Sequence, residues 1–180
     1  MIRTAQRNTD TFGENPHNSK SEDMNPVQID ISPENPDSAV ALGLLGQYYA
    51  DLSDRFPGGF DLASTVSAPS EELVAPFGAF LVVRLNGEAV GCGAVRVLTD
   101  SIGEIKRMWI SPRFRGRGLG RRLLIALEST AYDLGCSRLR LDTSDHLDEA
   151  IALYRTMGYR EIDPYNENAY ATRWFEKTKL

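Results

Sequence analysis

The chain has 180 residues, enough for one domain with a sizeable core, and its 42% hydrophobic and 25% charged residues are typical of a globular protein. Twenty lysines and arginines against twenty-five aspartates and glutamates give a net charge of −5, which argues against nucleic-acid binding by the chain as a whole. Two histidines and two isolated cysteines exclude a histidine-rich metal site and disfavour a disulfide scaffold. No apolar run is long enough for a membrane span or a secretory signal, so we expect a cytoplasmic protein that needs no metal and no membrane.

Residues 1–26 are polar and carry few apolar anchors, so they cannot bury enough surface to offset the entropy of ordering. We expect a disordered and dispensable tail there, and one folded domain over residues 27–180. The first elements predicted in this domain are a strand over 27–31, a helix that begins after Asp37 or Ser38 and ends before Pro57, and a loop over 58–78 with one short helix.

An antiparallel meander is predicted next. An apolar strand over 79–85 is followed by Asn86-Gly87, a pair typical of a type I′ turn, and by a return strand over 89–98. A third strand is expected over 102–110.

Beyond Pro112 the apolar spacing becomes helical. The elements predicted there are a helix from Gly118 to Gly135, a strand over 139–142, a helix over 148–157 with Asp145 as its cap, and strands over 159–162 and 171–177. This order predicts an α/β (α+β) domain with a mixed, mostly antiparallel sheet and helices on both faces.

The most specific local pattern is the segment Arg115-Gly116-Arg117-Gly118-Leu119-Gly120, between a predicted strand and a predicted helix. Glycines allow close approach of a ligand to the backbone, and a helix N-terminus attracts phosphate. The segment fails the dinucleotide fingerprint, because Arg121 stands where a glycine is needed, and it lacks the Lys-Ser/Thr pair of a P-loop. The six residues alone also fit a basic turn that caps an ordinary helix.

Three segments together resemble the GNAT superfamily of acyl-CoA-dependent N-acyltransferases. Residues 115–120 resemble its (Gln/Arg)-x-x-Gly-x-(Gly/Ala) pyrophosphate loop, and residues 104–112 resemble its fourth strand. Residues 149–159 resemble its Glu-Ala-x-x-Leu-Tyr-x-x-x-Gly-(Phe/Tyr) helix and strand. The resemblance covers residues 27–180, although before Ala79 it depends on the order of the elements alone.

The resemblance implies a single GNAT-like domain in which strands four and five splay apart and acetyl-CoA, as co-substrate, enters the gap. Backbone of strand four would pair with the pantetheine arm, and backbone N–H groups of the loop would face the pyrophosphate. The implied cofactor-binding residues are Met108, Trp109, Ile110, Arg115, Gly116, Arg117, Gly118, Leu119, Gly120 and Arg121.

The matching family tyrosine makes Tyr154 the candidate acid that protonates the departing thiolate; the alternative is a tyrosine that packs on the sheet. Glu104 lies eleven positions before Arg115, as the strand-four glutamate does in the histone-acetyltransferase branch, and is the candidate base. A solvated Glu104 paired with Lys106, or a water chain in place of a base, remains open. The backbone N–H of Met108 or Trp109 is the candidate oxyanion donor.

Cys92, within Gly91-Cys92-Gly93, allows a ping-pong nucleophile, although a buried core residue is the better interpretation. The family often places a cofactor-binding Asn where this chain has Leu147, and His146 is a weak substitute. We expect residues 56–77 and 163–170 to form the acceptor pocket, in which acidic residues would suit a cationic amine.

The sequence therefore predicts an N-acetyltransferase that moves an acetyl group from acetyl-CoA directly to a primary amine of a small molecule or a protein. A non-catalytic acyl-CoA-binding regulatory module is the alternative. A nucleic-acid binder is disfavoured, because the basic cluster is confined to one strand-loop-helix junction. A homodimer is left open. The basic residues of this cluster are Lys106, Arg107, Arg113, Arg115, Arg117, Arg121 and Arg122.

Overall fold

The computed structural model describes residues 27–64, 68–99 and 101–179. The predicted tail over 1–26 lies outside the described residues. In the described part of the chain, no helix is long and apolar enough to cross a membrane.

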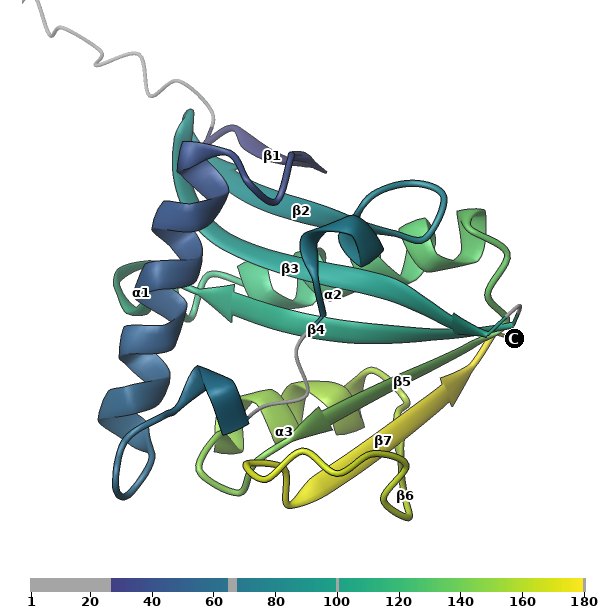
Figure 1. Cartoon of the computed structure of the whole chain (residues 1–180). Helices are drawn as coiled ribbons and strands as arrows, with labels where there is room; N and C mark the ends of the chain where they lie inside the picture. The colour runs from purple at the N-terminus through teal and green to yellow at the C-terminus, as the bar shows by residue number, and fades with distance from the viewer. Residues whose placement is uncertain (1–26, 65–67, 100, 180) are drawn as a thin grey trace, which may run out of the picture.

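One seven-stranded sheet forms the centre of the fold, in the order β1-β2-β3-β4-β5-β7-β6 (Figure 1). Its strands are β1 (Ile29–Pro33), β2 (Gly78–Leu85), β3 (Glu88–Thr99), β4 (Ile102–Ile110), β5 (Arg138–Thr143), β6 (Arg160–Ile162) and β7 (Arg173–Thr178). The helices are α1 (Ala39–Arg55), α2 (Leu119–Asp133) and α3 (Asp148–Thr156), with short 3-10 turns η1 (Leu62–Ser64), η2 (Ser70–Leu73) and η3 (Pro112–Phe114). The predicted element order and the mixed, mostly antiparallel sheet are confirmed.

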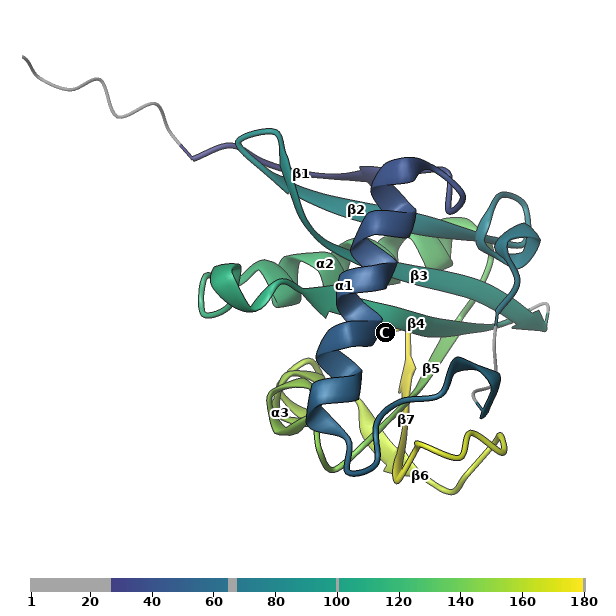
Figure 2. The ribbon, with the colours of Figure 1, turned by 60° about the vertical axis from the view of Figure 1, so that its left-hand side comes forward.

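Helices cover both faces of the sheet, as predicted. Alternation along β2 sends Phe80 and Val82 to a core beneath α1, whereas Leu81 and Val83 join a core beneath α2 and α3. Figure 2 shows α1 lying across one face, with α2 behind the sheet. The two cores hold the sheet rigid on both sides, which fixes the positions of residues at its open edge.

The sequence predicted side-chain caps for α1 and α3, and only the cap of α1 is present. The Ser38 hydroxyl accepts a hydrogen bond from the Ala41 N–H at 3.1 Å, so the predicted cap of α1 is confirmed. The predicted Asp145 cap of α3 is wrong: Leu147 is the N-cap residue, without a side-chain bond. Asp145 instead accepts a hydrogen bond from Arg173 Nε at 2.8 Å, because β7 brings a guanidinium next to its carboxylate.

The sheet opens between β4 and β5. These parallel strands pair only from Ile102–Glu104 to Arg138–Arg140, and their carboxyl ends then diverge (Figure 1). On its other side, β4 bulges against β3, since Cys92 pairs with Trp109 but Ala94 pairs with Lys106. The extra residue places Arg107 at φ +53°, a conformation that non-glycine residues rarely adopt. The splay and the bulge both lie at the middle of β4.

Close packing beside this bulge makes a glycine necessary at position 91. A Cβ added to Gly91 would lie 2.6 Å from the Trp109 carbonyl oxygen, so the β3–β4 pair would have to separate. We expect Gly91→Ala to lower the free energy of unfolding by about 1–3 kcal/mol, the cost of overpacking a core. On α1, Gly46 has open space around an added Cβ, and Gly46→Ala should instead stabilise by about 0.5–1 kcal/mol. Urea unfolding of both variants measures the contrast; equal effects would contradict it.

Candidate active site

A cavity of about 480 Å³ occupies the open side of the splay. The end of β4, the glycine-rich loop, and the N-terminal turns of α2 and α3 form its walls, and α1 closes one side. Its lining is mostly apolar, with charged groups near the loop. The cavity therefore suits a ligand with an extended arm and an anionic end.

The glycine-rich loop forms the anionic end of this cavity. Gly116 and Gly118 have φ values of +76° and +75°, and Gly118 is the N-cap residue of α2. An added Cβ at Gly120 would lie 3.6 Å from Leu153, so α2 and α3 approach closely there. Left-handed glycines at a helix N-terminus aim backbone N–H groups outward, which is the arrangement that binds phosphate. These residues thus fit the diphosphate of a nucleotide cofactor.

The basic residues of the loop occupy different positions relative to the cavity. Arg121 lines the cavity, whereas Arg117 lies over the Phe114 ring, 5.5 Å from its centroid, and does not line it. Arg115 donates hydrogen bonds from Nη2 to Asp51 at 2.5 Å and from Nε to the Ile110 carbonyl at 3.0 Å. Its guanidinium therefore ties the loop to α1 and β4 in addition to lining the cavity.

A chain of ion pairs joins α1 to α3 at the cavity mouth. Glu149 binds Arg55 at 2.6 Å and lies 3.6 Å from Arg115, and Asp51 also accepts a hydrogen bond from the Trp109 indole N–H at 3.0 Å. The hydrogen bonds from Arg55 lower the pKa of Glu149 below its usual range. The carboxylate form of Glu149 is thus favoured in the folded protein.

A lowered pKa contributes stability that is present above the unfolded value, about 4.3, and is lost as the pH falls through the folded value. Because Glu149 is about half exposed, we expect Glu149→Gln to cost no more than about 1 kcal/mol at pH 7. The difference should shrink as the pH falls below about 4.3 and vanish once the pH is below the lowered pKa of Glu149. Thermal melts of both proteins from pH 3 to 7 measure it, with Asp148→Asn, in the same helical turn, as control. A gap that does not shrink between pH 5 and pH 3 would contradict the ion-pair origin.

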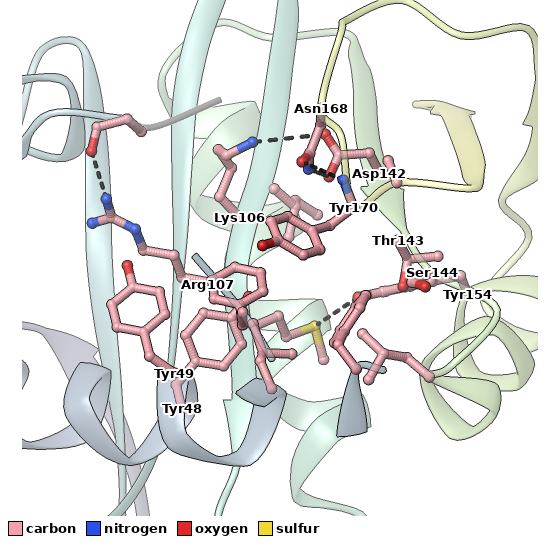
Figure 3. A pocket seen from close by; sticks show the side chains of 18 residues that line it. Tyr48, Tyr49, Lys106, Arg107, Asp142, Thr143, Ser144, Tyr154, Asn168 and Tyr170 are labelled. Carbon is pink, nitrogen blue, oxygen red and sulfur yellow. Dashed lines mark hydrogen bonds and ion pairs between the residues drawn. The ribbon is translucent and has the colours of Figure 1, made fainter. Parts of the chain in front are cut away.

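A second, smaller cavity of about 110 Å³ adjoins the first, and the middle of β4, the end of β5 and the loop before β7 line it (Figure 3). Its walls are aromatic, because the segment after α1 meets the loop before β7. The rings of Phe60 and Tyr170 lie 4.6 Å apart, and Phe56 contacts both edge-on or tilted. The Tyr170 hydroxyl accepts a hydrogen bond from the Asp61 N–H at 2.6 Å. Both segments predicted for the acceptor pocket thus contribute to this cavity.

The two cavities share part of their walls. The shared residues are Tyr48, Leu52, Met108, Leu147 and Tyr154. Tyr154 is 6% exposed, and its hydroxyl points to Met108 Sδ at 4.0 Å (Figure 3). Burial raises the pKa of Tyr154 above its usual value near 10, so the hydroxyl keeps its proton at neutral pH. A protonated donor therefore lies where the two cavities meet.

Glu104 lies apart from both cavities. It is 1% exposed and accepts hydrogen bonds from Arg96 Nε at 2.7 Å and from the Tyr165 hydroxyl at 3.0 Å. Lys106 Nζ is 3.6 Å away and also lines the smaller cavity. The expected pairing with Lys106 is present, but Glu104 is buried in a network rather than solvated.

The structure also places the cysteine and histidine candidates named from the sequence. Cys92 is fully buried, and burial raises the pKa of its thiol to about 12. His146 is exposed beside Phe56, whereas Leu147 lines both cavities. In the described part of the chain, no cluster of three or more His, Cys, Asp or Glu side chains could hold a metal ion.

Several lining residues were missed by the sequence analysis. Tyr48 was assigned only to the core face of a helix, Asp142 only to a strand, and Arg107 only to the strand-four segment and the basic cluster. The adjacent pair Tyr48-Tyr49 on an otherwise aliphatic helix was the available signal for an aromatic pocket.

Comparison with known proteins places this geometry in context. A family model described as the acetyltransferase (GNAT) family matches residues 46–159. An IAA acetyltransferase from Azospirillum brasilense is 35% identical over 138 residues, which cover 76% of this chain and 88% of that protein. A Klebsiella pneumoniae protein assigned as an acyl-CoA N-acyltransferase has a solved structure with 33% identity and a TM-score of 0.67, covering 84% of this chain and 98% of that one. A GNAT acetyltransferase from Elizabethkingia anophelis, solved with acetyl-CoA bound, is 19% identical with a TM-score of 0.59, covering 83% and 97% of the two chains.

Proposed function

Because this chain belongs to the GNAT family of acetyl-CoA-dependent acyltransferases, we propose that it transfers the acetyl group directly from acetyl-CoA to a primary amine. The observation that carries the proposal is the shared wall of the two cavities at Tyr154. One cavity has the glycine cradle for a diphosphate, the other has aromatic walls for an acceptor, and the two substrates can meet only between them.

In the proposed step, the acceptor nitrogen bonds to the carbonyl carbon of the thioester, and the carbon–sulfur bond breaks. The buried Tyr154 hydroxyl is placed to give its proton to the departing sulfur. The bulge at Arg107 and Met108 breaks the regular β3–β4 pairing, which supports a backbone N–H of Met108 or Trp109 as donor to the developing oxyanion.

The proton of the acceptor amine needs a separate route. Glu104 lines neither cavity, so we propose that it receives this proton through water or through Lys106, which lies between it and the smaller cavity's interior. A general base can act through one intervening water, so a carboxylate behind the pocket wall can still accept the proton. Lys106 also disfavours an ammonium beside it, which lowers the pKa of a bound amine.

The experiment that tests the proposal is release of free thiol from acetyl-CoA across a panel of amines, with mass spectrometry of the product. Amine-dependent thiol release together with an acetylated amine is the expected result. Tight binding of acetyl-CoA without thiol release for any small-molecule or peptide amine would contradict transfer and favour a binding module.

Direct transfer predicts that Cys92 is not an acyl carrier. Its thiol is fully buried with a pKa near 12 and lines neither cavity, so Cys92→Ala should keep turnover within about threefold while losing about 1–2 kcal/mol of stability to the small void. Steady-state thiol release and a melting curve measure the two effects. An acetylated Cys92 trapped with acetyl-CoA alone would contradict the expectation.

A further inference from the structure

The smaller cavity is cationic although the chain is acidic. Its charged lining residues are Lys106, Arg107 and Asp142. Asp142 is already matched, because it accepts hydrogen bonds from Asn166 at 2.6 Å and Asn168 at 2.9 Å and lies 3.7 Å from Lys106. The carboxylate of Asp142 is therefore engaged by the protein itself.

Arg107 is the cation of this cavity that lacks such a match. Within the described residues, no carboxylate forms an ion pair with it, and its one hydrogen bond goes from Nη2 to the Ala68 carbonyl at 2.7 Å. The three residues before Ala68 are Thr65, Val66 and Ser67, which carry no carboxylate side chain. A guanidinium has five N–H donors in a fixed fork that matches a carboxylate.

The backbone conformation that places Arg107 on this wall is energetically unfavourable. Its φ of +53° lies in a region that non-glycine residues rarely adopt, and it occurs at the β4 bulge. Bulges beside active sites turn a side chain toward a new direction. An unfavourable backbone conformation together with an unmatched cation on a pocket wall is an arrangement that serves ligand binding rather than folding.

We propose that the acceptor amine carries a carboxylate at the end remote from its nitrogen, that Arg107 binds this carboxylate, and that the aromatic walls hold the body of the molecule. The inference rests on the proposed transfer reaction. Figure 3 shows the Arg107 guanidinium and the Tyr154 hydroxyl at separate ends of the pocket. The rings of Tyr48, Tyr49 and Tyr170 lie along the pocket between α1 and the β7 loop. The expected acidic wall for a cationic acceptor is thus replaced by a carboxylate-binding one.

A matched pair of rigid probes tests the proposal. The first probe, 4-(aminomethyl)benzoate, has an amine and a carboxylate at opposite ends of a ring, and 4-(aminomethyl)benzamide is its neutral isostere. Their N-acetylated products can be titrated by calorimetry into the full chain saturated with coenzyme A, so that binding is measured without turnover. We expect the acid to bind about 10- to 100-fold more tightly than the amide, the worth of a hydrogen-bonded charge pair.

Variants assign this preference to one side chain. Arg107→Gln should abolish the preference for the acid, and Arg107→Lys should keep part of it, because the charge remains but the fork is lost. Arg160→Gln is the matched control: Arg160 is exposed on β6 and lines neither cavity. Equal affinity of the two wild-type complexes, a preference that survives Arg107→Gln, or tighter binding of spermidine than of the acid would overturn the proposal.

Thiol release and product binding together distinguish a failure of the proposed transfer from a failure of the proposed carboxylate site. If Arg107→Gln does not fold, the wild-type comparison and Arg107→Lys decide the outcome. Acid-selective binding without thiol release from any amine would contradict acetyl transfer and still support a carboxylate site at Arg107. Thiol release with an amine panel in which the amide probe matches the acid probe would support transfer and overturn the carboxylate site.

Discussion

Replacing Gly118 with aspartate is expected to lower the affinity for acetyl-CoA by more than about 100-fold, because like charges brought together in a binding site cost several kcal/mol. Gly118 caps α2 at φ +75° and lines the larger cavity, so the new carboxylate would stand where the diphosphate is expected. An added Cβ there meets no atom within 4 Å, so the substitution should leave the fold intact apart from about 1–2 kcal/mol of backbone strain. Calorimetry with acetyl-CoA measures the affinity.

Two variants separate charge from strain. Gly118→Ala shares the backbone penalty without the charge and should lose much less affinity. Gly87→Asp places the same side chain at another left-handed glycine, φ +85°, in the hairpin turn and away from both cavities. Unchanged affinity in a folded Gly118→Asp protein would contradict the assignment of the diphosphate site.

Tyr154→Phe is expected to reduce turnover by about 10- to 10⁴-fold, the range of general-acid catalysis and of a lost positioned donor. The ring stays in its place between Tyr159 and Phe175, so only the proton is removed. The affinity for acetyl-CoA should change little, because the diphosphate contacts that we propose lie in the loop at 115–120. The measurements are steady-state thiol release and calorimetry on the purified variant.

Tyr159 offers a matched control for this substitution. It is 4% exposed, lines neither cavity, and its hydroxyl has no hydrogen-bond partner among the described residues. Tyr159→Phe should therefore leave turnover unchanged, and its stability should stay level or rise. Equal turnover in wild type and Tyr154→Phe, with chemistry rate-limiting, would exclude the acid role. A large loss of affinity at unchanged turnover would make Tyr154 a cofactor-binding residue.

Local signals in the sequence were sufficient for most of the fold. Asn86-Gly87 predicted the hairpin, and both residues have positive φ, as a type I′ turn requires. The 3.6-residue spacing of Leu119, Leu123 and Leu127 predicted the buried face of α2. The Asp145 cap failed because a long-range partner, Arg173, lies 28 positions away and competes for the carboxylate.

The site was predictable to the extent that it depends on backbone. Glycines and a helix N-terminus have a sequence signature, so the left-handed glycine loop at the start of α2 could be anticipated. The destinations of charged side chains could not, since they depend on which strands meet: Arg115 binds Asp51 of α1, and Glu104 is enclosed by Arg96 and Tyr165. Arg107 was named only in the strand-four segment and in the basic cluster. Its place on a pocket wall could not be predicted, because a bulge arises from the mismatch of two strands rather than from one pattern.

The short pairing of β4 with β5 gives the molecule a pivot. The sheet is joined there across only three residue pairs, Ile102–Glu104 with Arg138–Arg140, and the two halves separate beyond them as a wedge. At the wide end of the wedge, the Arg55–Glu149 ion pair ties the two halves together on the surface. A small rotation about the pivot would give its largest displacement at this ion pair. It would also strain the core beneath α2 and α3, because that core contains residues of both halves. A ligand bound in the wedge should restrict this rotation. We expect it to slow amide hydrogen exchange at the end of β5 that does not pair with β4.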